Sequence, residues 1–315
     1  NTNAYGIELA DYGHPKVDEG LPQYNLAYAV NQKDSTPLFY ELYDGSVIDN
    51  TELEIMLEEA KEFGHEKLGV LMDRGYISEK NIKALRTKGY EYILMMKQNQ
   101  RICQEIIEEY GAAVQSLEGY YIGEHGVYGT TVKKQLYGQE TNIHVYYDDI
   151  RASEEKVALM SRYETWEKEI EKKVAKRIAT EGEMKKYKKV FKLKYDQNGY
   201  LVAYQRNSRY IKEEIRNLGF FFIMTSEDMS ASKALDIYRG RDNIEKMFRS
   251  LKSGIDFNKA RVHTTESLKS KVFVTFIAMI VRNELFQKAE ELRKKNRKAY
   301  TVPGMISELE NIECT

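Results

Sequence analysis

The segment KLGVLMD, Lys67 to Asp73, places a few apolar residues between a lysine and an aspartate. Its short apolar run predicts a buried β-strand that ends on an acidic residue. A helix is expected near Ser78 to Lys88, and YEYILMMK, Tyr90 to Lys97, predicts another strand. Strand, helix and strand in this order predict an α/β layer with a parallel portion.

The flanking sequence extends the same pattern. YNLAYAVNQKDSTPLFYELY, Tyr24 to Tyr43, predicts a β-hairpin around the polar turn NQKDST. DNTELEIMLEEAKEFG, Asp49 to Gly64, predicts a helix because it has an Asn/Thr start, apolar residues at helical spacing and a glycine stop. Further on, LGFFFIMTS, Leu218 to Ser226, resumes the buried-strand pattern.

The middle of the chain has a different pattern. Short strands with polar or glycine-containing turns are expected there, interrupted by a charged helical stretch from Glu154 to Lys186. The sequence therefore predicts an α/β fold with a mixed sheet flanked by helices and a β-rich insertion. We expect residues 1–97 and 218–315 to form the two parts of the core, and residues 98–217 to form the inserted subdomain.

The net charge of −1 conceals an asymmetry between the halves of the chain. Counting residues along the sequence, residues 1–150 carry a charge of −12 and residues 151–315 carry +11. Acidic groups gathered in one half can hold divalent cations, and a basic half can bind phosphates regardless of base sequence. Two solvated faces of a nearly neutral protein are an equally good explanation of composition alone.

The composition argues against a membrane protein. The longest apolar run, Val272 to Val281, is too short to cross a bilayer and predicts a buried core helix. Cys103 and Cys314 lack the spacing of metal ligands, so a reducing cytoplasm is the simplest setting.

IYRGRDNIEKMFRSLK, Ile237 to Lys252, is a helix-like segment with polar side chains at helical spacing. At about 100° per residue, a stripe roughly 60° wide beside an apolar face would contain Tyr238, Arg241, Glu245 and Lys252. One interpretation is a solvated face with an ion pair between residues four apart. The other is a carboxylate held between two cations and a phenol hydroxyl, which suits a metal-bound phosphate.

The strand-end carboxylate, Asp73, also allows two interpretations. An acidic residue in this place is commonly the N-cap of the next helix. Ligands also gather outside the carboxyl ends of strands in open α/β sheets, so Asp73 is well placed for a site. A cation, a flexible residue and an aromatic ring follow it in the order Arg74, Gly75 and Tyr76.

Together, these motifs resemble a known family. DRGY at Asp73 to Tyr76, with the later pattern Tyr-x2-Arg-x3-Glu-x6-Lys, is similar to the YREK subclass of bacterial DDE insertion-sequence transposases. The motifs occur in the expected order, and the segment between them resembles the β-rich insertion of such enzymes. The similarity extends to GLPQYNLAYAV, PLFYELYDGSVID and GIDFNKARVH.

The resemblance implies an RNase H-like catalytic core that cuts double-stranded DNA at element ends and joins the freed 3′-hydroxyl to target DNA. Asp73 and Glu245 are then catalytic carboxylates and ligands of two Mg²⁺ or Mn²⁺ ions. The other implied contacts to DNA come from Arg74, Tyr76, Tyr238, Arg241 and Lys252. Pairing two element ends implies at least a homodimer on DNA.

One part of the family pattern is not matched within the sequence. The first catalytic Asp of the family precedes a Thr, and if Thr2 is that residue, the Asp falls just before Asn1 and these residues alone are inactive. Asp11 is the nearest substitute, although its context does not match. Trp166 either stacks on an extruded base or packs in the insertion. A decayed protein that only binds DNA and a nuclease that only hydrolyses it remain alternatives.

Overall fold

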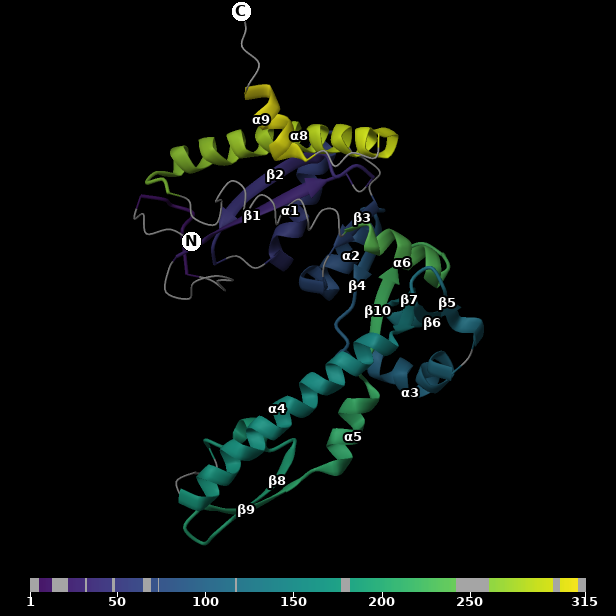
Figure 1. Ribbon diagram of the computed structural model, residues 1–315, viewed down its shortest axis with the longest axis vertical. Coiled ribbons are helices and arrows are strands. Elements are labelled where there is room, and N and C mark those ends of the chain that lie inside the picture. The colour runs from purple at the N-terminus through teal and green to yellow at the C-terminus, as the bar shows by residue number, and fades with distance from the viewer. Residues whose placement is uncertain are drawn as a thin grey trace, which may run out of the picture. The chain divides into compact units, whose positions relative to one another are not determined.

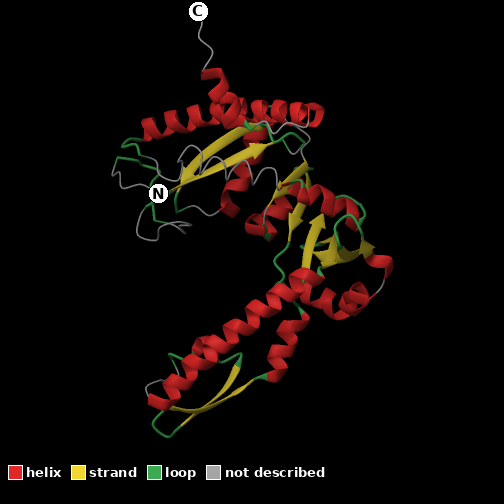
Figure 2. Cartoon of the chain, in the orientation of Figure 1, coloured by secondary structure: helices red, strands yellow, loops and turns green. Residues whose placement is uncertain are grey.

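The structure is a computed structural model (Figure 1). It describes residues 6–12, 22–31, 33–46, 49–64, 69–72, 74–116, 118–176, 182–241, 261–296 and 301–310. Helices and strands are interspersed along this length (Figure 2). The chain divides into two compact units, one of residues 1–91 with 235–315 and one of residues 92–234.

A six-stranded mixed sheet flanked by helices confirms the predicted RNase H-like α/β fold. Its strands lie in the order β3-β4-β10-β7-β6-β5. Their bounds are β3 Gly69–Met72, β4 Glu91–Met95, β5 Tyr121–Ile122, β6 Val127–Leu136, β7 Gln139–Tyr147 and β10 Phe220–Thr225. The strands predicted around Lys67 to Asp73, Tyr90 to Lys97 and Leu218 to Ser226 are therefore present as β3, β4 and β10.

Strand β10 lies between two partners and is buried along its whole length. It pairs antiparallel with β4, where Ile223 lies opposite Met95, and with β7, where the same residue lies opposite His144. Gly219 precedes it with a φ of +79°, and a Cβ there would come within 2.6 Å of the Ala152 side chain. Glycine is therefore required at the entry to this strand.

The segment between β4 and β10 contains more helix than the sequence predicts. The described residues of this segment form three α-helices: α3 Arg101–Ser116, α4 Asp149–Lys176 and α5 Ser208–Arg216. Of these, α4 matches the predicted helical stretch from Glu154 to Lys186, but it begins earlier, at Asp149, and ends earlier, at Lys176. Helix α3 has a clear helical pattern of buried residues, including Cys103, Ile106 and Val114, which the strand-centred interpretation overlooked.

Helix α4 and a two-stranded sheet share a separate core within the unit of residues 92–234. The sheet consists of β8 Phe191–Tyr195 and β9 Leu201–Arg206, and helix α5 follows it (Figure 1). Side chains from the helix, from the short turn before β8 and from both strands are buried together: Leu159, Tyr163, Ile170, Met184, Tyr187, Val190, Phe191 and Leu201.

The other unit contains the predicted hairpin and its neighbouring helices. Strands β1 Tyr24–Val30 and β2 Pro37–Asp44 pair antiparallel, and α1 Asp49–Glu62 and α2 Glu79–Thr87 follow at the expected places. Helix α8 Thr265–Asn296 lies along the hairpin and contacts α9 Val302–Glu310 (Figure 1). The Phe276 ring of α8 lies 5.1 Å from that of Tyr40.

Helix α8 corrects the expectation of a buried core helix. Val272 and Met279 are buried, but Phe273 and Val274 are 55% and 65% exposed. Within the described part of the chain, the apolar run Val272 to Val281 is therefore buried on one side and exposed on the other. No described helix combines the length and apolar character needed to cross a membrane.

His144 connects three strands of the sheet through a buried hydrogen-bond network. Its Nδ1 lies 2.8 Å from the Thr131 hydroxyl of β6, and its Nε2 lies 3.1 Å from the Thr225 hydroxyl of β10. Because Thr225 donates its proton to the Glu227 carbonyl, the network assigns the proton of the neutral ring to Nε2. Burial lowers the pKa of His144 to about 4, against an opposing effect of Asp228.

This network predicts a loss of stability in mild acid. The unfolded chain protonates His144 below about pH 6.5, whereas the folded chain does so only near pH 4, so stability falls between these values. Between pH 7.5 and 5, protonation of His144 in the unfolded chain lowers the free energy of unfolding by about 2 kcal/mol. Measured by urea unfolding, the free energy of unfolding of His144→Gln should therefore fall by about 2 kcal/mol less over this pH range than that of the unmodified chain. The control, His263→Gln, changes an exposed position and should give the same fall as the unmodified chain.

A second prediction concerns two tyrosines in the α4 core. The Tyr163 hydroxyl is buried with no hydrogen-bond partner among the described residues, whereas the Tyr187 hydroxyl donates to the Glu169 carboxylate. Tyr163→Phe should therefore raise the free energy of unfolding by about 1 kcal/mol, and Tyr187→Phe should lower it. Fluorescence of Trp166, the single tryptophan, reports unfolding of this core. A loss of stability in Tyr163→Phe would contradict this account.

Candidate functional site

A tight turn follows β3 at the place where the sequence predicts a catalytic carboxylate. The turn is a 3₁₀ helix of residues Arg74–Tyr76, and it packs against α1. Ser78 then caps helix α2 by accepting a hydrogen bond of 3.1 Å from the Asn81 backbone N–H. The N-cap of this helix is therefore Ser78, which removes the need for Asp73 in that role.

Asn81 connects helix α2 to this turn. Its side chain is fully buried, and Nδ2 donates a hydrogen bond of 2.9 Å to the Tyr76 carbonyl. The other amide atom, Oδ1, is also buried and has no partner among the described residues. A buried amide that bonds the backbone of a turn restricts the positions that the turn can adopt.

Tyr238 and Arg241 are brought together, as their spacing predicts. Tyr238 is buried in the last turn of helix α6, Ala231–Arg239, and Arg241 is partly exposed. The Arg241 guanidinium carbon lies 4.8 Å from the centre of the Tyr238 ring, a cation–π contact. This contact holds the guanidinium over the ring and restricts its motion.

The prediction of one uninterrupted helix from Ile237 is wrong at Gly240. Helix α6 ends at Arg239, Gly240 forms a turn, and Arg241 is again helical. Glycine has a low helix propensity, which accounts for a break at this position.

Trp166 packs inside the α4 core. Its ring lies 5.7 Å from the Tyr187 ring in an edge-on arrangement, 6.0 Å from Tyr163, and 5.4 Å from the Arg162 guanidinium. These contacts agree with ordinary packing. A role in stacking on an extruded base stays a prediction.

Several residues of the predicted site cannot be placed. Asp73, Glu245 and Lys252 lie outside the described residues, and only the backbone of Arg74 is described. Within the described ranges, no three His, Cys, Asp or Glu side chains form a group that could hold a metal ion. Asp11 is exposed and forms an isolated β-bridge with Gln23.

The sequence interpretation did not find Asn81. A signal was nevertheless present, because Asn81 lies four residues before Leu85 and next to Ile82 on the buried side of α2. A polar residue among apolar residues on one helix face indicates a buried hydrogen bond. Its partner is a backbone carbonyl, which cannot be identified from residue types.

The comparison with protein families agrees with this arrangement. The model of the transposase DDE domain matches residues 5–281, a range that contains both predicted motifs. A search of curated proteins found no match. Because the family match extends over most of the sequence, this chain belongs to the transposase DDE domain family.

Proposed function

We propose that the chain is the catalytic domain of a bacterial insertion-sequence transposase of the YREK subclass, which cleaves element ends and transfers the strand to target DNA. The family match over residues 5–281 is the observation that carries the proposal, because it includes Asp73 and the complete Tyr238 to Lys252 motif. The contact between Tyr238 and Arg241 supports this role for the motif.

The proposal assigns Asp73 and Glu245 as catalytic metal ligands. Carboxylate oxygens are the ligands that Mg²⁺ and Mn²⁺ prefer, so these two side chains fit a two-metal site. Such ions activate the attacking oxygen and stabilise the leaving one when they are bound.

The remaining motif residues are proposed to bind the DNA backbone. Arg241 offers two parallel N–H donors to a phosphate, and its contact with Tyr238 reduces the entropy lost on binding. Lys252 supplies a compact positive charge. Arg74 and Tyr76, in the turn after β3, and Trp166 complete the proposed DNA contacts. We further propose a homodimer on DNA and a cytoplasmic setting.

The first test replaces Glu245 in the full-length protein. Glu245→Gln keeps the size of the side chain but removes the charge needed by the metal ions, so cleavage of element-end DNA with Mn²⁺ should fall by at least about a thousandfold. Asp73→Asn should behave alike. Glu154→Gln, at an exposed position of α4, is the matched control and should leave cleavage unchanged.

Different outcomes of this assay separate the alternatives. Unchanged cleavage in Glu245→Gln would reject the assigned site. Binding without cleavage in the unmodified protein would favour a decayed DNA-binding protein. Cleavage without joined products would favour a nuclease that only hydrolyses.

A second test concerns Asn81 as a positioning residue. Asn81→Ala removes the hydrogen bond to the Tyr76 carbonyl and loosens the turn that follows Asp73. We expect the Mn²⁺ concentration for half-maximal cleavage to rise roughly tenfold, because groups that orient metal ligands affect metal affinity on this scale. DNA affinity measured without metal should stay the same. A variant that loses stability but keeps the metal requirement would show a purely structural role.

A further inference from the structure

The turn before β8 and the strand itself form a dense group of lysines. Residues Met184 to Tyr195 contain six lysines and no acidic residue. All six are exposed: Lys185, Lys186, Lys188, Lys189, Lys192 and Lys194. Lys186 pairs with Glu169 of α4 at 3.1 Å, but a run of six lysines with no acidic residue among them still produces a local positive potential.

The strand geometry places two of these lysines on one face. In β8, Phe191 is buried and Leu193 packs against the α4 core. Because side chains alternate along a strand, Lys192 and Lys194 point to the opposite side. Their cross-strand neighbours on β9 are Gln205 and Ala203. We call this outer side of β8 and β9 the lysine face.

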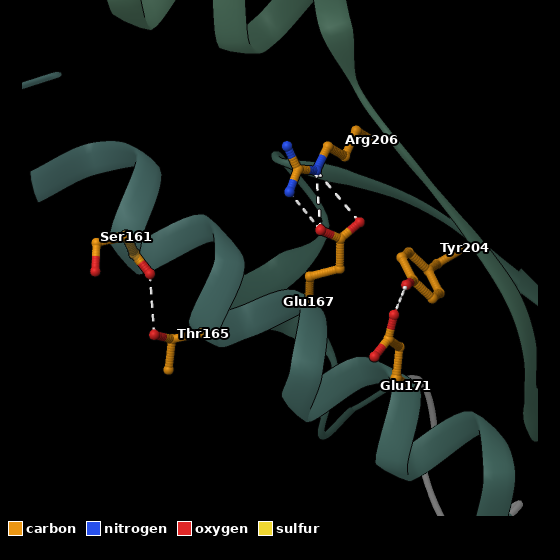
Figure 3. Close-up of polar contacts among 6 residues, drawn as sticks. All are labelled: Ser161, Thr165, Glu167, Glu171, Tyr204 and Arg206. Carbon is orange, nitrogen blue, oxygen red and sulfur yellow. Dashed lines mark hydrogen bonds and ion pairs between the residues drawn. The ribbon is translucent and has the colours of Figure 1, made fainter. Parts of the chain in front are cut away.

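The inner side of the same ribbon is held to α4 by carboxylates (Figure 3). Both carboxylate oxygens of Glu167 accept hydrogen bonds from Arg206 Nε, at 3.2 and 3.1 Å. One turn further along α4, the Glu171 carboxylate accepts a hydrogen bond of 2.9 Å from the Tyr204 hydroxyl. Burial, and then Glu171, raise the pKa of Tyr204 to about 12, so the phenol remains a donor.

These contacts leave the two sides of the ribbon with different charges. Acidic side chains of α4 pair with β9 on the inner side, and neither β8 nor β9 contains an acidic residue. Asp196, at the turn between the strands, accepts hydrogen bonds of 2.9 Å from the backbone N–H groups of Asn198 and Tyr200. No ion pair is found for Lys192 or Lys194 within the described ranges.

From this arrangement, we infer that the lysine face binds the phosphate backbone of duplex DNA independently of base sequence. The inference rests on the proposed function in taking DNA as the partner. Residues two apart in a strand are about 7 Å apart, so Lys192 and Lys194 form a short row of positive charges on a supported ribbon. A two-stranded ribbon is also narrow enough to lie along a DNA groove.

The test measures binding rather than cleavage. Lys192→Gln/Lys194→Gln in the full chain removes two charges from exposed positions, and fluorescence anisotropy with a labelled 30-base-pair duplex of arbitrary sequence reports affinity between about 50 and 200 mM salt. We expect affinity at the lower salt to fall roughly tenfold, and the slope of log K against log salt to become shallower by about 2, since each lost phosphate contact contributes about 0.9.

The control removes the same charge from another face. Lys168 and Lys172 are exposed on α4, on the side of the helix away from Tyr163 and Ile170. Lys168→Gln/Lys172→Gln should leave the salt slope nearly unchanged, and Lys192→Arg/Lys194→Arg should keep the binding of the unmodified chain. Equal losses in the two glutamine variants, or no loss in Lys192→Gln/Lys194→Gln, would overturn the inference.

This outcome is independent of the catalytic assignment. Glu245→Gln tests cleavage and should keep the lysine-dependent binding, because Glu245 does not belong to the lysine face. A full-length protein that binds duplex DNA through the lysine face but does not cleave element-end DNA would refute the proposed catalysis alone. A chain that cleaves DNA with the same salt slope in both glutamine variants would refute the lysine face alone.

Discussion

The pairing of β10 with β4 on one side and β7 on the other is the constraint on which the six-stranded sheet depends. All six residues of β10 are buried, so its backbone groups must be satisfied by strands rather than by water. In the chain, β4 precedes and β10 follows the long segment that contains β5 to β9. The pairing of β10 with β4 therefore brings the two ends of this segment side by side. The segment thus enlarges the sheet as well as carrying the α4 core.

A buried strand between two partners tolerates polar side chains only when they bond each other. His144 and Thr225 meet this condition because they share a hydrogen bond, and the other ring nitrogen of His144 bonds the Thr131 hydroxyl. Their bonds join β6, β7 and β10 at one level of the sheet. The same low dielectric that strengthens these bonds keeps the ring neutral, so the network couples the integrity of the sheet to the protonation of one histidine.

Local patterns predicted the parts of this fold that depend on short stretches of sequence. The apolar run of β10, the hairpin β1–β2 and the position of helix α2 all follow from residue types within a few positions. Helix α3 was missed because the expectation of a β-rich segment took precedence over its helical pattern. The order of strands could not be obtained in this way, since the pairing of β10 with β4 joins segments more than a hundred residues apart.

The candidate site was predictable to a similar extent. The spacing of Tyr238 and Arg241 indicated that they are neighbours, because three residues make nearly one helical turn. Asn81 has a role that depends on a carbonyl of the preceding turn, and no residue type reveals a backbone partner.

The α4 core shows how opposite charges can be sorted between the two sides of a thin ribbon. A two-stranded sheet alone is only marginally stable, so β8 and β9 need α4 for support. The helix covers one side of the ribbon, where Phe191 and Leu201 are buried and Glu167 bonds Arg206 at the edge. Alternation along β8 then directs Lys192 and Lys194 outward, since an ammonium group buried without a partner would destabilise the core. The charge of the outer side is therefore a consequence of how the inner side is stabilised. A ribbon held in this way would lose little backbone entropy on binding the proposed DNA partner.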